Sequence, residues 1–183
     1  MVDRSTHVRR RIGEKYNQDC LKRTVKHPVS VMIWSIISTH GPGAIYVVDG
    51  TMNSQQYCNE VISKHLIPQL RSWFPKSKNY IFMQDIAPCH TSKFTTEFLK
   101  RKCISVLPWP GNSPDLNPIE NVWKMLKDKI ATCHLTSKVE LVNKIKDIWF
   151  HDTDVKRTIK NCTESMPRRI EAVINNKEDA TKY

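Results

Sequence analysis

Apolar residues in the first part of the chain are grouped in runs of strand length. Residues 29–38 and 44–48 are largely apolar and predict two strands. The segment 41–43, Gly-Pro-Gly, is typical of a turn, so we expect the two strands to form a hairpin with a buried face. Shorter apolar runs at 80–83 and 104–107 predict two further strands, and the first of these ends close to Asp85.

Helical spacing of apolar residues begins after the hairpin. Residues 53–74 fit one helix, which Pro68 is expected to kink or shorten because proline has no amide N–H to donate. A second helix is expected around residues 94–99, where Phe and Leu lie on one side. Either Thr91 or Ser92 can cap the N-terminus of this helix.

Three more helices are expected in the second half of the chain. Asn117 can cap the first of them and Pro118 fits its first position, which places Glu120 in the first turn. Residues 137–140 form a capping-box pattern that starts the next helix. A last helix is expected to follow Pro167.

This order of elements predicts an α/β fold, with a sheet that has helices on both faces. The length of 183 residues suits one domain with tails. We expect a basic arm or loop at 1–28, the core at 29–135 and a helical extension at 136–183. The C-terminal ends of parallel strands open on one crevice, and Asp85 is expected at such an end.

The composition is typical of a globular protein, but it is strongly basic. The chain has 29 Lys and Arg against 18 Asp and Glu, which gives a formal charge of +11. Such a surface binds polyphosphates through counterion release, so nucleic acid is the first partner to consider. Solvated lysines on helix faces are the alternative explanation for this charge. A membrane partner is not expected, since no apolar run is long enough to span a bilayer.

The six cysteines include no CxxC pair, which favours reduced thiols inside a cell. Cys89-His90 and Cys133-His134 are each adjacent residues, and without a second spaced pair they do not predict a zinc site.

Asp85 and Glu120 are the strongest candidates for chemistry. They are separated by 34 residues and come from different predicted elements, so a fold can bring them to one site. Carboxylate oxygens suit Mg²⁺, and a pair of such ions can promote phosphodiester cleavage. Each residue also has a structural explanation: Glu120 can complete a helix cap, and Asp85 can be a turn residue at a strand end.

Several motifs together resemble the Tc1-like branch of the Tc1/mariner transposases. The resemblance covers nearly the whole chain and is carried by Val31 to Trp34, Thr51 to Asn53, Gln84 to His90, Trp109 to Trp123, and Met166 to Ile170. It implies an RNase H-like fold in which three acids hold two Mg²⁺ (or Mn²⁺) ions. Such enzymes cut DNA at transposon ends and join the freed 3′-hydroxyl to a target, which implies a nuclear location.

The resemblance maps the second and third acids of the family to Asp85 and Glu120. The first acid of the family lies on an apolar strand upstream of the basic stretch that here begins at Val8. Asp3 could be a displaced relic of it, but no strand precedes Asp3 in this sequence. That strand is central to an RNase H-like sheet, so its loss would leave unpaired backbone groups and a gap in the core. We therefore expect an incomplete active site and an inactive chain.

The resemblance also implies DNA contacts. The candidates are Arg9, Arg10 and Arg11 in the basic segment, and Lys124 and Lys127 after Glu120, although the two lysines fit a solvent-exposed helix face equally well. The tryptophans at 34, 123 and 149 are expected in the core. A homodimer is considered because related transposases pair two DNA ends, and no small-molecule substrate is expected. Three hypotheses remain: a DNA-cutting and DNA-joining enzyme, a DNA-binding remnant without turnover, and a truncated product without function.

Overall fold

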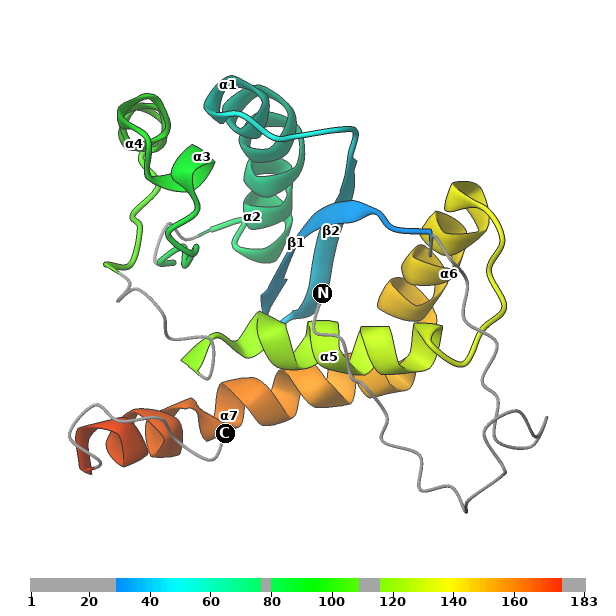
Figure 1. Cartoon of the computed structure of the whole chain (residues 1–183). Coiled ribbons are helices and arrows are strands. Elements are labelled where there is room, and N and C mark those ends of the chain that lie inside the picture. Colours follow the sequence, from blue (N-terminus) through cyan, green and yellow to red (C-terminus); the bar gives the residue numbers. More distant parts are fainter. Residues whose placement is uncertain (1–28, 77–79, 109–115, 176–183) are drawn as a thin grey trace, which may run out of the picture.

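The computed structural model describes residues 29–76, 80–108 and 116–175, and a two-stranded hairpin lies at its centre (Figure 1). Strand β1 (Met32–Ser38) pairs antiparallel with β2 (Gly41–Val48), from Met32 opposite Val48 to Ser38 opposite Gly41. The predicted hairpin is confirmed, but the turn is not at 41–43. It is formed by Thr39 and His40, and the glycines belong to β2.

A continuous helical segment follows the hairpin. It consists of α1 (Ser54–Gln56), the π-helical η2 (Tyr57–Leu66) and α2 (Ile67–Trp73). Asn53 starts it with a capping box, in which its side chain and that of Gln56 each accept a hydrogen bond from the other's backbone N–H. Pro68 does not end the helix. It lies at the start of α2, where π-helical hydrogen bonding changes to α-helical bonding.

The next segment contains α3 (Pro88–Thr91) and α4 (Lys93–Arg101). Ser92, one of the two predicted caps, is the N-cap of α4, because its Oγ accepts a hydrogen bond from the Thr95 N–H at 3.1 Å. The strands predicted at 80–83 and 104–107 are reduced to one parallel bridge between Phe82 and Val106.

Three long helices complete the fold: α5 (Pro118–Ile130), α6 (Lys138–His151) and α7 (Thr153–Asn175). The prediction that a helix starts after Pro167 is wrong, because Pro167 lies inside α7. Val155 and Ile159, which precede the proline on α7, are completely or almost completely buried in the core. This packing stabilises α7 and offsets the cost of a proline inside a helix, which is about 3 kcal/mol.

The hairpin separates two hydrophobic clusters, so helices cover both faces as predicted (Figure 1). On one face Ile36 packs with residues of η2 and α2, and also with Phe82, Leu99 and Ile104. On the other face Ile33 packs with residues of α5, α6 and α7. The boundaries proposed at 28/29 and 135/136 stay predictions.

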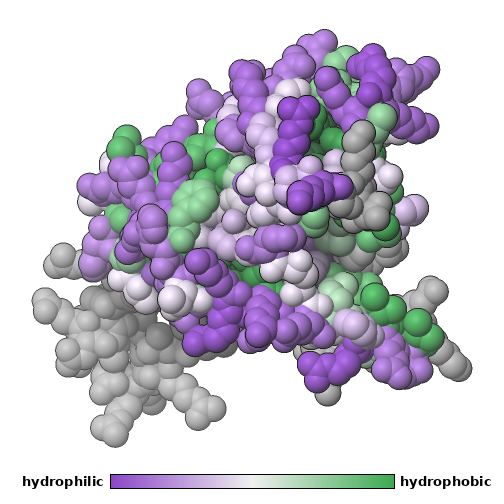
Figure 2. Space-filling model, turned by 180° about the vertical axis from the view of Figure 1, so that it is seen from behind, coloured by the Kyte–Doolittle hydropathy of each residue, from purple (hydrophilic) through white to green (hydrophobic). Residues whose placement is uncertain are grey.

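Polar residues cover most of one face of the molecule. Figure 2 shows the rear of the molecule as mostly hydrophilic, with hydrophobic residues in smaller patches. Within the described residues, no helix combines the length and the apolar character that crossing a membrane requires.

Candidate functional site

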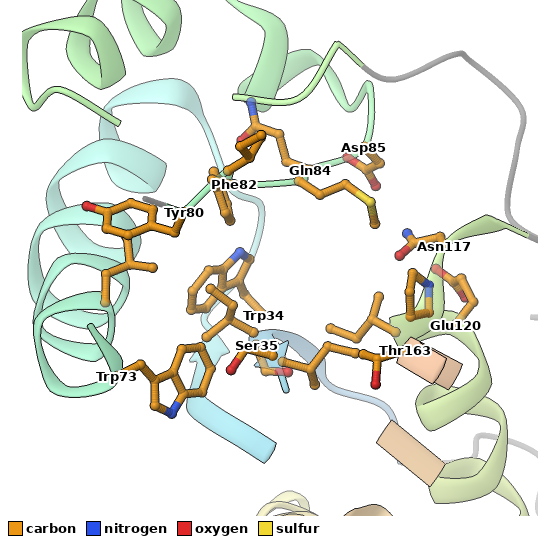
Figure 3. Close-up of a pocket in the computed structure, with 18 of the residues that line it drawn as sticks. Trp34, Ser35, Trp73, Tyr80, Phe82, Gln84, Asp85, Asn117, Glu120 and Thr163 are labelled. Atoms are coloured by element: carbon orange, nitrogen blue, oxygen red, sulfur yellow. The ribbon is translucent and has the colours of Figure 1, made fainter. Parts of the chain in front are cut away.

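A cleft of about 380 Å³ separates β1 from the extended segment 80–85 (Figure 3). Its lining includes every residue of 33–38 on one side and every residue of 80–85 on the other, and it ends at residues 117–120 of the α5 N-terminus. No residue of β2 lines it, so the cleft lies along the edge of β1 that faces away from β2.

Backbone groups on both sides of this cleft lack strand partners among the described residues. Strand β1 pairs only with β2. Phe82 uses both of its backbone groups on the other side, since its N–H donates to Ser105 O and its O accepts from the Leu107 N–H, both at 2.8 Å. Successive peptide groups of a strand point to opposite edges, so those of Ile81 and Met83 are directed toward the cleft. Among the described residues this edge of β1 therefore has no strand partner, and the expected gap in the sheet stays a prediction.

Asp85 lies where the extended segment ends. Its Oδ1 accepts a hydrogen bond from the Ala87 N–H at 3.0 Å and lies 2.5 Å from His90 Nδ1. The contact with the Ala87 N–H is a turn interaction, and a turn role was the structural explanation considered for Asp85. Asp85 therefore does shape the local turn. Both contacts use Oδ1, however, and the side chain is 59% exposed, which leaves Oδ2 available to a ligand.

Glu120 lies in the first turn of α5 and is exposed. The capping explanation for this residue is wrong, because α5 has no side-chain cap hydrogen bond, and Glu120 makes no side-chain hydrogen bond or ion pair with the described residues. Asn117 is the N-cap residue, yet its Oδ1 is buried without a hydrogen-bond partner in the described structure. Figure 3 shows Asn117 between Asp85 and Glu120 on the cleft wall.

Behind Asp85 lies a partly buried polar network that the sequence did not reveal. The ring of His90 packs against that of Tyr57 with centroids 4.3 Å apart, and the Tyr57 hydroxyl donates to Gln84 Oε1 at 2.9 Å. Gln84 in turn donates from Nε2 to the backbone O of His90 at 3.2 Å. Burial raises the pKa of Tyr57, so this hydroxyl keeps its proton. The only sequence signal was that His90 follows Asp85 by five residues.

Neighbouring thiols are held in their neutral form. Burial raises the pKa of the Cys89 thiol and of the Cys58 thiol, and a neutral thiol is a poor metal ligand. Oxygen ligands therefore dominate this region.

The other predicted residues fall into three groups. Lys124 and Lys127 are exposed on α5, and Lys124 lines a second cavity beside α6 rather than the cleft. The tryptophans are core residues as predicted: Trp149 is fully buried, Trp123 stacks on it at 5.2 Å, and Trp34 packs against the first cluster. The remaining candidates, Asp3, Arg9, Arg10 and Arg11, lie outside the described residues.

Comparisons with known proteins agree with this fold. Residues 2–142 match the family described as DDE superfamily endonuclease. The chain is 31% identical over 184 residues to the Tc1 transposase of Caenorhabditis elegans, with 99% of this chain and 65% of that protein covered. The chain thus spans less than two thirds of the length of this relative.

Two solved structures show the same fold. The crystal structure of the catalytic domain of Mos1 mariner transposase aligns with a TM-score of 0.74 at 23% identity, covering 83% of this chain and 76% of that one. The Mos1 mariner paired end complex with Mn aligns with a TM-score of 0.77 at 23% identity, covering 89% of this chain and 48% of that one.

The chain therefore belongs to the DDE superfamily endonucleases, within the Tc1/mariner group of transposases. It has the mixed α/β, RNase H-like fold of a transposase catalytic domain, which confirms the fold class expected from the sequence.

Proposed function

We propose, against the expectation of an inactive chain, that this chain cleaves DNA strands and transfers them at a site that uses a divalent metal ion, Mg²⁺ or Mn²⁺. The observation that carries the proposal is the arrangement of Asp85 and Glu120. The two carboxylates come from different elements, line one cleft, and have oxygen atoms that no described residue engages. The two acids have 34 residues between them in the sequence, and their place on one cleft supports a shared ion.

The residues present fit a hard divalent cation. Carboxylate oxygens are the ligands that Mg²⁺ and Mn²⁺ prefer, and the unpartnered, buried Oδ1 of Asn117 adds a neutral oxygen to the same wall. Asp85 and Glu120 would hold the ion. When bound, it supplies Lewis-acid stabilisation of the charge that develops on the phosphate.

Basic residues would bind the phosphates of the DNA. A net charge of +11 favours a polyphosphate ligand. Arg9, Arg10 and Arg11, together with Lys124 and Lys127, are the proposed phosphate contacts, because cations fix the register of the duplex without reading its bases. A DNA substrate implies action in the nucleus, and pairing of two transposon ends implies a homodimer; both belong to the proposal.

The test is cleavage of DNA carrying the matching transposon ends, with Mg²⁺ or Mn²⁺ supplied. Asp85→Asn and Glu120→Gln preserve the size of each side chain and remove its charge, so each variant is expected to lose cleavage by at least about 100-fold. Asp128→Asn, on the exposed face of α5, is the matched control and should cleave like the wild type. Cleavage that persists in the Asp85 and Glu120 variants would remove this proposal.

A second candidate is a DNA-binding domain without turnover. It is favoured by the finding that the described residues contain no group of three or more His, Cys, Asp or Glu placed to hold a metal ion. Under this alternative the wild-type protein binds DNA in a salt-sensitive manner and cleaves none of it with either ion.

A further inference from the structure

His90 is a largely enclosed polar side chain next to the proposed metal ligand Asp85. Its side chain is only 14% exposed, whereas that of its partner Asp85 is 59% exposed. His90 lies at the third position of α3, on the wall of the cleft that also contains Gln84 and Asp85. It is therefore placed behind the carboxylate, where it can act on the orientation of that group.

The surrounding residues hold the imidazole ring in this position. One face of the ring packs against Tyr57, which is completely buried and therefore a rigid support. Gln84 links the two residues, because it accepts a hydrogen bond from the Tyr57 hydroxyl and donates one to the backbone O of His90. Trp34 of β1 packs against the same hydrophobic cluster that contains Tyr57. The orientation of His90 is thus set by η2 as well as by its own helix.

We propose that His90 is a positioning residue for Asp85, an inference that rests on the proposed metal-dependent function. An ionised carboxylate can only accept hydrogen bonds, so the 2.5 Å contact places a proton on His90 Nδ1, which donates it to Oδ1. The Ala87 N–H donates to the same oxygen. Together they fix the carboxylate plane and leave Oδ2 to the cation that Asp85 would hold. Residues that orient metal ligands in this way raise metal affinity without touching the ion.

The first test needs no metal. Nitrogen NMR of the metal-free protein, labelled at its histidines, reports which ring nitrogen of His90 carries the proton. A protonated Nδ1 whose resonance shifts in Asp85→Asn is expected. A His90 ring with no proton on Nδ1, or one that does not respond to Asp85→Asn, would overturn the inference.

The second test measures Mn²⁺ binding to the full chain by electron paramagnetic resonance. His90→Ala is expected to weaken binding by about 10- to 100-fold, as loss of such orienting partners commonly does. His90→Asn should recover part of that affinity, because its side-chain N–H₂ can approach the position of Nδ1. His151→Ala, at the exposed C-terminal end of α6, is the matched control and should bind as the wild type does.

The outcomes separate this inference from the proposed function. If Asp85→Asn loses Mn²⁺ while both His90 variants bind it like the wild type, the positioning role is wrong and the metal site stands. If the wild type does not bind Mn²⁺, the proposed function fails at this site, and the positioning role falls with it. Comparison with the folded His90→Asn variant ensures that misfolding of His90→Ala cannot imitate the expected result.

Discussion

Gly43 lies where β2 passes closest to α2. A Cβ atom at this position would come within 2.6 Å of Trp73 Cη2 and 2.7 Å of Ile36 Cγ2, both well inside contact distance. The backbone O of Gly43 also accepts a hydrogen bond from Trp149 Nε1 at 2.8 Å, which ties β2 to α6. A single residue without a side chain thus allows helices on both faces of the hairpin to approach it.

We therefore expect Gly43→Ala to destabilise the fold. Trp73 packs against the core and stacks on His40, so it can move only at a cost, and overpacking of this kind costs about 1–3 kcal/mol. Urea unfolding should show the loss as a lower midpoint. In a Trp73→Leu background the same substitution should cost less, because the indole atoms nearest to the new methyl group are gone. An equal cost in both backgrounds would show that the close approach to Trp73 is not the cause.

Residue identity predicted only part of the candidate site. Asp85 and Glu120 could be selected from their spacing and from the elements around them, and the structure places both on one cleft. The role of His90 could not be predicted, because it depends on Tyr57, which is 33 residues away in the sequence. Burial of a polar network is a property of the tertiary fold, and no local pattern reports it.

Among the elements, α5 and α7 are joined by a small ion-pair network. Lys129 Nζ, near the end of α5, lies 2.5 Å from Asp152 Oδ2 and 2.6 Å from Asp154 Oδ2 at the start of α7. The hydrogen bond between Lys129 and Asp152 is the largest cause of two pKa shifts. It lowers the pKa of Asp152 and raises the pKa of Lys129. Arg157 pairs with Asp154 from the next turn of α7.

This network predicts a pH-dependent stability. A carboxyl group with a pKa below its ordinary value of 3.8 contributes stability that is present above 3.8 and is lost as the pH falls through the lowered pKa. Lys129→Met should therefore lower the urea midpoint at about pH 6, and the difference from the wild type should shrink as the pH falls below 3.8. Lys144→Met, which removes a 3.3 Å contact to Asp147 within α6, is the control. A difference that stays constant with pH would contradict the ion-pair explanation.

The elements were easier to predict than the residues at which they begin and end. The hairpin, α4 and α5 follow from apolar periodicity, and α4 also from its Ser92 cap, and these agree with the structure. The start of α7 at Thr153 and its passage through Pro167 depend instead on packing against α5 and on Lys129. The predicted strands at 80–83 and 104–107 shrink to one bridge because strand length depends on a neighbouring strand, which the sequence of either segment does not encode.

For the whole molecule, the excess of basic residues should govern the interaction with DNA. Each phosphate contact releases counterions, so the logarithm of the affinity falls linearly with the logarithm of the salt concentration. Replacing Arg9, Arg10 and Arg11 by Ala should reduce the magnitude of this slope by roughly one for each contact that is lost.

Fluorescence anisotropy with labelled duplex DNA over a range of salt concentrations measures this slope. The matched control replaces three exposed lysines by Ala, which changes the net charge equally: Lys146, Lys156 and Lys160. If the two triple variants give the same slope, the effect belongs to total charge and not to the arginine cluster.

The two backbone edges that face each other across the cleft also affect how this protein behaves among other molecules. Residues 33–38 and 80–84 include no lysine, arginine, aspartate or glutamate, the side chains that ordinarily protect exposed edges. An extended apolar stretch of another polypeptide would find hydrogen-bonding templates on two sides and apolar walls above and below it. Among the described residues no strand fills this space, so two copies that meet along these edges can associate strand to strand.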